Sequence, residues 1–310
     1  MGAQQRILRQ RIKDTQATKK ITKAMELIAS SQIMKAQAAV EATEPYALTL
    51  QRALTLATSH AQVSHPLLTV NEDPKRAAVL VVTSDRGLAG AYSSNVIKEA
   101  EKLGSNLHEK GIKEVNYLVG RKSIGYYSFR ERPIEAQWSG FSDKPNVEQA
   151  ERIADRLLED FLKPTEEGGV DEIHIVFTRF VSRVNQVPTV LRIVPLDVVE
   201  EVVDTSDSGI TAVEEKGGKA IWPLYDFEPS ADDTLDALLP QYIRHLVYVA
   251  LLEAAASEHA ARQRAMKSAS DNAEDLIKSY TRQANQARQA EITQEISEIV
   301  GGADALASAK

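Results

Sequence analysis

The sequence predicts an α/β fold combined with a long antiparallel coiled coil. The helices at the two ends of the chain form the coiled coil, and the middle of the chain forms an open, mostly parallel sheet. Three observations predict it. Residues 3–86 contain no glycine. Residues 241–300 contain neither glycine nor proline, although average usage would place about seven of them there. Between these stretches, residues 75–196 alternate strand and helix patterns.

The N-terminal stretch predicts a helix over residues 3–58. Pro45 lies inside it and removes one backbone donor, so we expect a kink near residues 42–46 and not a clean break. Apolar residues recur at steps of three and four, as on one face of a helix. They are Ile7, Leu8, Ile12, Ile21, Met25, Ile28, Ile33, Ala36, Val40, Ala47, Leu50 and Leu54.

The C-terminal stretch predicts a second helix over residues 232–300. Pro240 allows an alternative start at Leu239 or later, and Gly301 with Gly302 predicts the stop. At 1.5 Å per residue the two helices reach about 84 and 100 Å. A compact domain of 200 residues has a radius of gyration of only ~16 Å, so neither helix fits wholly on the middle of the chain. Pairing with each other is therefore favoured.

The middle of the chain predicts an open, mostly parallel, Rossmann-like sheet with helices on both faces. Strands are expected at 77–82, 114–119, 133–138, 172–177 and 187–194, and helices at 93–110, 123–131 and 146–162. Residues 200–222 are polar and acidic and lack an apolar pattern, which predicts a mobile loop.

Composition and charge narrow the class of protein. The 310 residues include no cysteine, which excludes disulfides, thiolate metal sites and cysteine nucleophiles. No apolar run approaches the ~20 residues that span a bilayer, and residues 1–14 lack the apolar stretch of a secretory signal, so we expect a soluble cytoplasmic protein. The net charge is −7, yet residues 1–40 carry eight basic and two acidic residues. This basic first helix indicates either an acidic partner surface or a solvated helix face.

One turn, TSDRGLAGAYS at 83–93, is similar to a phosphate-binding loop. It matches neither G-x-G-x-x-G nor G-x-x-x-x-G-K-[ST], so we expect a tight turn in which Asp85 and Ser94 satisfy backbone donors, with a nucleotide site as the alternative. The six histidines lack zinc spacing, and no G-x-S-x-G frames a nucleophile. We therefore expect no catalytic residue, cofactor or metal, and no nucleic-acid site. A mechanical or scaffolding role is favoured.

Three further segments match a known pattern: RQRIKDTQATKKITKAMELIASSQIMKAQ at 9–37, LVVTSDRGLAG at 80–90, and ASEHAARQRAMKSASDNAEDLI at 256–277 followed by ARQAEITQEISEIVGGADAL at 287–306. In this order they resemble the gamma subunits of bacterial F-type ATP synthases. The resemblance implies a shaft inside a hexameric sleeve of alpha and beta subunits, with the α/β domain at the foot against the epsilon subunit and the c-subunit ring. It also implies a non-catalytic central rotor that couples proton flow to ATP synthesis or hydrolysis, peripheral to the cytoplasmic face of the cell membrane.

The resemblance also implies roles for particular residues. Met25, with Lys23 nearby, is expected to face the lever loop of a beta subunit. A catch loop of a beta subunit is expected to meet Arg288, Gln289, Thr293 and Glu295. The same coupling region would include Arg262 and Glu298, whereas Tyr225 and Glu228 would lie at the foot near the c ring. The alternative for each is an ordinary coiled-coil or solvent-facing residue.

These expectations divide the chain into four parts. They are an N-terminal shaft helix at 1–60, a central α/β domain at 75–199, an acidic loop and foot segment at 200–230, and a C-terminal shaft helix at 231–310. Two other functions remain as alternatives: a nucleotide-binding α/β enzyme with helical dimerisation arms, and a coiled-coil adaptor that joins complexes.

Overall fold

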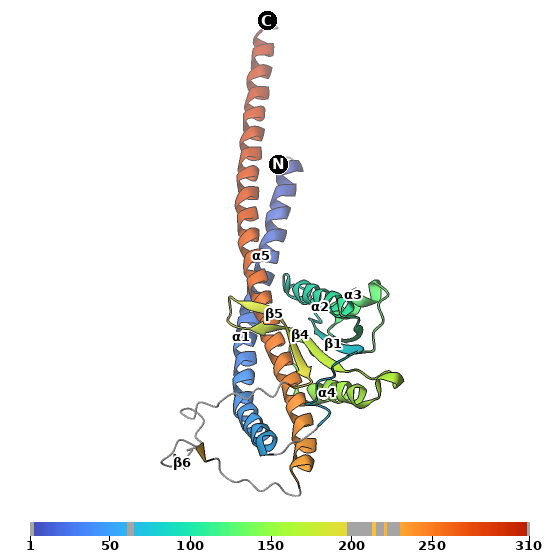
Figure 1. The fold of residues 1–310 in the computed structure, drawn as a ribbon. Helices are drawn as coiled ribbons and strands as arrows, with labels where there is room; N and C mark the ends of the chain where they lie inside the picture. The colour runs from blue at the N-terminus through green and yellow to red at the C-terminus, as the bar shows by residue number, and fades with distance from the viewer. Residues whose placement is uncertain (1–2, 61–64, 197–212, 215–219, 222–229, 309–310) are drawn as a thin grey trace. The chain divides into compact units, whose positions relative to one another are not determined.

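The computed structural model describes residues 3–60, 65–196, 213–214, 220–221 and 230–308. A helix of 58 residues, α1 (Ala3–His60), lies near the N-terminus, and a helix of 78 residues, α5 (Ala231–Ser308), lies near the C-terminus (Figure 1). Both predicted terminal helices are confirmed. Pro45 lies inside α1 without ending it, as expected, and the kink at 42–46 stays a prediction.

The start of α5 is set by a cap that the sequence analysis overlooked. Ser230 Oγ accepts a hydrogen bond from the Asp233 amide at 3.1 Å and donates one to the Asp233 carboxylate at 2.6 Å. A serine at this position satisfies an amide of the first turn that has no partner within the helix. Leu235 and Leu239 are fully buried and hold the next turns in place around Pro240. The alternative start at Leu239 or later was therefore wrong.

The end of α5 also differs from the prediction. The helix continues through Gly301 and Gly302 to Ser308, so the expected stop at the two glycines was wrong. A glycine in a helix costs only about 1 kcal/mol relative to alanine. The residues after Gly302 include three alanines and a leucine up to Ser308, and both residue types favour helix.

The central sheet is mostly parallel, as predicted. Its strand order is β3-β2-β1-β4-β5, and the three pairs among the first four strands are parallel. The last strand is antiparallel to β4, because only residues 181–185 join the two and a parallel return needs a longer crossover. The strands are β1 (Arg76–Val82), β2 (Lys113–Val119), β3 (Ala136–Trp138), β4 (Glu172–Phe180) and β5 (Gln186–Val194).

Helices cover both faces of the sheet. Alternate residues of β1 point to opposite faces, so β1 contributes to a separate core on each face. The helices of the sheet region are α2 (Tyr92–Glu109), α3 (Arg121–Phe129), α4 (Val147–Leu162) and the single 3-10 turn η1 (Thr165–Glu167). One core joins β1 to α2 and α3 through Ala77, Val79, Val81, Val96, Ala100 and Tyr127. The other joins β1 to α4 and α5 through Ala78, Leu80, Val82, Ile153, Leu157, Leu239 and Ile243.

The region predicted as a mobile acidic loop contains two short strands, β6 (Val213–Glu214) and β7 (Ala220–Ile221), which pair antiparallel. The remainder of residues 200–222 lies outside the described residues. The chain forms two compact units, and the long helices contribute to both. The helix-pair unit comprises Met1–Met34, Gly87–Gly90 and His259–Lys310, and the sheet unit comprises Lys35–Arg86 and Ala91–Glu258.

Asp171 ties the start of β1 to the residues before β4. Its carboxylate accepts hydrogen bonds from the amides of Lys75 and Arg76 at 2.8 and 2.9 Å, and from the side chains of Thr165 and Asn71 at 3.0 Å. Partial burial acts to raise the pKa of this carboxyl, but the amides and the two side-chain donors outweigh it and lower the pKa. The charged form is therefore favoured at the edge where both strands begin.

Gly120 supports a backbone conformation that other residues resist. Its φ is +92°, and a Cβ atom there would lie 2.2 Å from the Thr83 carbonyl oxygen. We predict that Gly120→Ala lowers the free energy of unfolding by about 3 kcal/mol or more, through strain and displacement of β1. Urea unfolding followed by circular dichroism measures the change.

Gly125→Ala is the matched control, because a Cβ at Gly125 meets nothing within 4 Å. Gly125 lies inside α3, so alanine there should raise stability by up to ~1 kcal/mol. Equal stabilities of the two variants would contradict the strain assigned to Gly120.

Candidate functional site

The helix-pair unit brings the two ends of the chain together in antiparallel order. As the residue number rises along α1, the number of its partner falls along α5, which confirms the predicted antiparallel pairing. Three pairs show the order: Arg11 with the Tyr280 ring at 6.0 Å, Lys19 Nζ with Glu274 Oε2 at 3.0 Å, and Thr22 Oγ1 with Ser270 Oγ at 2.7 Å.

The seam between the two helices is apolar and includes one buried polar pair. Ala29, Ile33 and Met266 are each at most 4% exposed. Thr22 and Ser270 are also buried, and their hydroxyls hydrogen-bond to each other. A shift of one helix along the other would break this hydrogen bond and leave the buried Ser270 hydroxyl without its partner, at a cost of about 1–3 kcal/mol. Thr22 Oγ1 would keep its 3.1 Å hydrogen bond to the Lys19 carbonyl oxygen of its own helix. This pair therefore favours one register of the helices.

The turn at Gly87–Gly90 also belongs to the helix-pair unit. Arg262 of α5 is 9% exposed, and its guanidinium lies 3.5 Å from the Gly87 carbonyl oxygen, at the limit of a hydrogen bond. The structure thus places Arg262 in a contact within the chain and not on an open surface.

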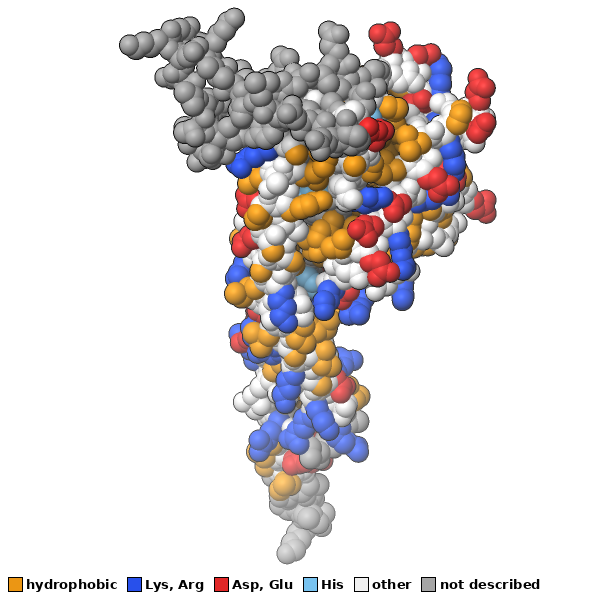
Figure 2. Space-filling model, turned by 90° about the horizontal axis from the view of Figure 1, so that it is seen from below, with side chains coloured by type: hydrophobic (Ala, Val, Ile, Leu, Met, Phe, Trp, Pro, Cys, Tyr) orange, Lys and Arg blue, Asp and Glu red, His pale blue; other side chains and the backbone are white. Residues whose placement is uncertain are grey.

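Two predicted coupling residues, Lys23 and Met25, lie on α1 within three residues of Thr22. Lys23 is exposed and forms an ion pair with Glu26 at 3.0 Å, whereas Met25 is half-buried. Large apolar side chains of α1 are also exposed, at 54–62% each. They are Ile7, Ile21, Leu27, Ile28 and Met34. Figure 2 shows one face on which exposed apolar side chains lie next to Lys and Arg side chains.

The end of α5 extends beyond the first residue of α1 (Figure 1). We call residues 288–301 the tip, and every residue of the tip except the half-buried Glu291 is exposed. Thr293 donates to the Gln289 carbonyl and Gln294 to the Glu298 carboxylate, so these contacts remain within the helix. The tip carries the predicted residues Arg288, Gln289, Thr293, Glu295 and Glu298, together with exposed Ile292, Ile296, Ile299 and Val300.

The remaining predicted contacts, Tyr225 and Glu228, lie outside the described residues. No described helix is long and apolar enough to cross a membrane. Nor do the described His, Asp and Glu residues form a group of three or more that would hold a metal ion.

The turn after β1 is filled by a carboxylate of the chain itself. Asp85 accepts hydrogen bonds from the amides of Arg121, Gly140 and Ser142 at 3.1, 2.7 and 3.0 Å. These amides belong to the segments that follow β2 and β3, at the carboxyl end of the parallel strands, which is where α/β sheets bind ligands. Because Asp85 already supplies the negative charge there, a phosphate would be repelled. The predicted role of Asp85 is confirmed.

The predicted role of Ser94 was wrong. Its hydroxyl donates to the Ala91 carbonyl at 2.9 Å, and α2 begins without a side-chain cap. The pairing of Thr22 with Ser270 was not predicted. The available signal was a small hydroxyl residue beside the apolar stripe on each helix, which is too common to identify a pair.

A family model described as ATP synthase matches residues 4–306. The ATP synthase gamma chain of Kineococcus radiotolerans is 58% identical over 308 residues, which cover 99% of this chain and 98% of the relative. The chain belongs to the ATP synthase gamma-chain family. The gamma chain of Thermobifida fusca is 56% identical over 309 residues, covering 100% of this chain and 98% of the relative.

Solved structures with the same fold include rotor components of mitochondrial ATP synthases. The central stalk and c-ring structure from Tetrahymena thermophila includes a chain with a TM-score of 0.56 and 21% identity, covering 81% of this chain and 99% of that one. A rotor chain from Euglena gracilis has a TM-score of 0.59 and 16% identity, covering 94% and 100%. At these identities the likeness concerns the fold.

The buried hydroxyl pair allows a direct test of the antiparallel seam. The chain contains no cysteine, so a disulfide in Thr22→Cys/Ser270→Cys has one possible pairing within a copy. The 2.7 Å between the two oxygens places the sulfurs near the ~2.05 Å that a disulfide needs. We predict that mild oxidation links α1 to α5 within one chain, seen as faster migration on a non-reducing gel.

Lys20→Cys/Ser270→Cys is the control pair. Lys20 is exposed and lies two residues, or about 200°, around α1 from Thr22, so we expect no internal link. A link between two copies of the Thr22→Cys/Ser270→Cys variant, in place of the internal one, would contradict the seam.

Proposed function

We propose that the chain is the central rotor shaft of an F-type ATP synthase, which couples proton flow through a ring of c subunits to ATP synthesis or hydrolysis at the beta subunits. The observation that carries the proposal is the antiparallel pairing of the chain's own two ends, in a sequence that matches ATP synthase gamma chains over its full length. A coiled-coil adaptor would instead pair the helices of two copies.

The exposed residues of the helix-pair unit suit a shaft that turns inside a sleeve. Large apolar side chains on α1 and on the tip remain exposed among the described residues, and a ring of alpha and beta subunits would cover them. Apolar contacts are not directional, so they hold the shaft at many angles with similar energy. Charged residues at fixed positions along the shaft then favour particular rotational angles of the shaft inside the sleeve.

We assign those preferred angles to the predicted coupling residues. Lys23 and Met25 contact a beta subunit near the middle of the shaft. On the tip, a second beta-subunit loop is met by Arg288, Gln289, Thr293 and Glu295. Glu298 belongs to the same coupling region. The buried Arg262 acts differently, by holding the turn at Gly87–Gly90 against α5.

The chain has no nucleotide chemistry of its own in this proposal. Asp85 occupies the place at the end of the sheet where a phosphate would bind, so the catalytic sites belong to the partner subunits. Tyr225 and Glu228 are proposed to face the c ring, and the sheet unit to contact the epsilon subunit. Residues 1–60 and 231–310 then form the shaft, residues 75–199 the α/β domain, and residues 200–230 part of the foot. The complex, and not a described helix of this chain, attaches it to the cytoplasmic face of the membrane.

Native mass spectrometry of a complex purified through a tagged copy of the chain tests the proposal. We expect one copy with three copies each of two larger nucleotide-binding chains. A tagged chain recovered only as a homodimer would favour the adaptor, and a monomer that binds ATP would favour the enzyme. Either result would contradict the rotor proposal.

Arg288→Ala tests the assignment at the tip. Arg288 is exposed and forms no ion pair within the described residues, so a partner carboxylate is free to bind its planar guanidinium. We predict that proton-driven ATP synthesis in membrane vesicles falls about thirtyfold per assembled complex, since truncating one partner of a buried interfacial charge pair costs about 2 kcal/mol or more.

Arg152→Ala is the control, because this exposed arginine pairs with Glu148 on α4, within the sheet unit. It should leave synthesis unchanged. If Arg288→Ala and Arg152→Ala give the same rate and the same ratio of ATP made to protons moved, Arg288 has no coupling role.

A further inference from the structure

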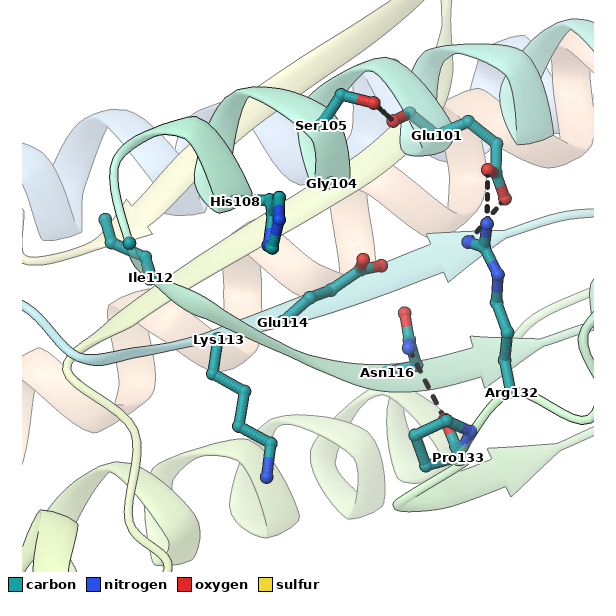
Figure 3. Close-up of a pocket in the computed structure, with 11 residues that line it drawn as sticks. Glu101, Gly104, Ser105, His108, Ile112, Lys113, Glu114, Asn116, Arg132 and Pro133 are labelled. Carbon is teal, nitrogen blue, oxygen red and sulfur yellow. Dashed lines mark hydrogen bonds and ion pairs between the residues drawn. The ribbon is translucent and has the colours of Figure 1, made fainter.

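The sheet unit contains an open pocket of about 570 Å³ near the start of β2, at the opposite end of the parallel strands from the turn after β1. It lies between the second half of α2, the first half of β2 and the residues before β3 (Figure 3). Ile112 and Pro133 give it apolar walls, and Glu114 and Asn116 point into it from β2. The rotor function assigned above makes no use of these residues.

Two oxygen acceptors of this pocket lack a donor among the described residues. Asn116 is 5% exposed, and its Nδ2 donates to the Pro133 carbonyl at 3.4 Å, which orients the amide and leaves Oδ1 without a partner. Oε1 of Glu114 also has none. Figure 3 shows both groups directed to the same part of the pocket. Buried acceptors without donors are rare in folded proteins, and each costs about 1–3 kcal/mol.

The backbone of α2 makes room for the Glu114 carboxylate. A Cβ atom at Gly104 would lie 2.5 Å from Glu114 Oε2. Glycine inside a helix costs about 1 kcal/mol relative to alanine, so its presence in α2 disfavours the helix. The same glycine lets the carboxylate rest against the helix. Gly104 of α2 and Asn116 of β2 therefore shape the site together with the Glu114 carboxylate.

The positive groups of the pocket offset the Glu114 charge only in part. Arg132 donates two hydrogen bonds of 2.7 Å to Glu101 and is thereby paired. Lys113 extends away from Glu114 in Figure 3. Burial raises the pKa of Glu114, an effect that Arg132 opposes and Glu101 strengthens. A donor-bearing cation placed beside Glu114 and Asn116 would remove the cost of burying this carboxylate.

We propose that this pocket binds the ammonium or guanidinium end of an alkyl chain. The cationic N–H groups donate to Glu114 and to Asn116 Oδ1, and the alkyl part packs on Ile112 and Pro133. A bare metal ion fits less well, since Mg²⁺ or Ca²⁺ takes six or more oxygen ligands and the described acidic and histidine side chains form no group of three.

Titration of the full chain with n-butylammonium chloride tests the proposal, with n-butanol as the uncharged probe. The ¹³C-labelled δ1 methyl group of Ile112 reports occupancy by NMR. We expect a saturable shift with butylammonium and none with butanol at the same concentration. No saturable shift, or an equal response to both probes, would overturn the proposal.

Three variants separate binding from folding. Glu114→Gln keeps the shape and removes the charge, and Gly104→Ala displaces the carboxylate while favouring the helix. Both should weaken butylammonium binding at least tenfold, which is about 1.4 kcal/mol. Glu109→Gln removes an exposed carboxylate at the end of α2, outside the pocket, and should bind as the unchanged chain does. Equal affinity of Glu114→Gln and Glu109→Gln would contradict the site.

The cation has two possible sources, a free amine or a lysine or arginine of a partner protein. The same titration on the complex recovered with the tagged chain distinguishes them. A free amine as natural ligand leaves the site open to butylammonium in the complex. A partner side chain closes it, so butylammonium no longer shifts the Ile112 methyl group. The isolated chain binds butylammonium in both cases, and its failure to do so would sink the proposal while leaving the rotor function untouched.

Discussion

The fold depends on bringing together two helices that are separated by most of the chain. Lys19 and Glu274, which form an ion pair, are 255 residues apart. Closing so long a loop by chance is costly, but the folded sheet unit removes most of that cost. There Leu54 of α1 and Ile243 of α5 belong to the same core. Residues of both long helices therefore already lie in one core of the sheet unit, apart from their pairing in the helix-pair unit.

The secondary structure was predictable where a pattern extends over many residues. The absence of glycine and proline and the apolar periodicity identified both long helices, and alternating strand and helix signals identified the sheet. The ends of elements were less predictable, because they depend on single interactions of about 1 kcal/mol. Ser230 starts α5 through one hydrogen bond to Asp233, and Gly301 fails to stop it.

The candidate site was predictable only in part from the residues themselves. Exposure and apolar spacing follow from the sequence, but the roles proposed for Met25 and Arg288 came from the family resemblance. Asp85 was recognised as part of a turn, yet its partners Arg121 and Gly140 are 36 and 55 residues away in the sequence. The same holds for the pocket at Glu114, whose space depends on Gly104 in another element. Contacts of this kind need the tertiary structure.

Because the two long helices differ in length, one part of the shaft is a stiff helix pair and the other is a more flexible single helix. Where α1 and α5 run side by side, bending one helix compresses or stretches the other, so the pair is stiff. Beyond the start of α1 a single helix remains, with Arg288 near its base and Ile299 near its end. A lone helix yields to smaller torque. Torque acting between the helix pair and a partner held at the tip would therefore twist the single helix more than the pair.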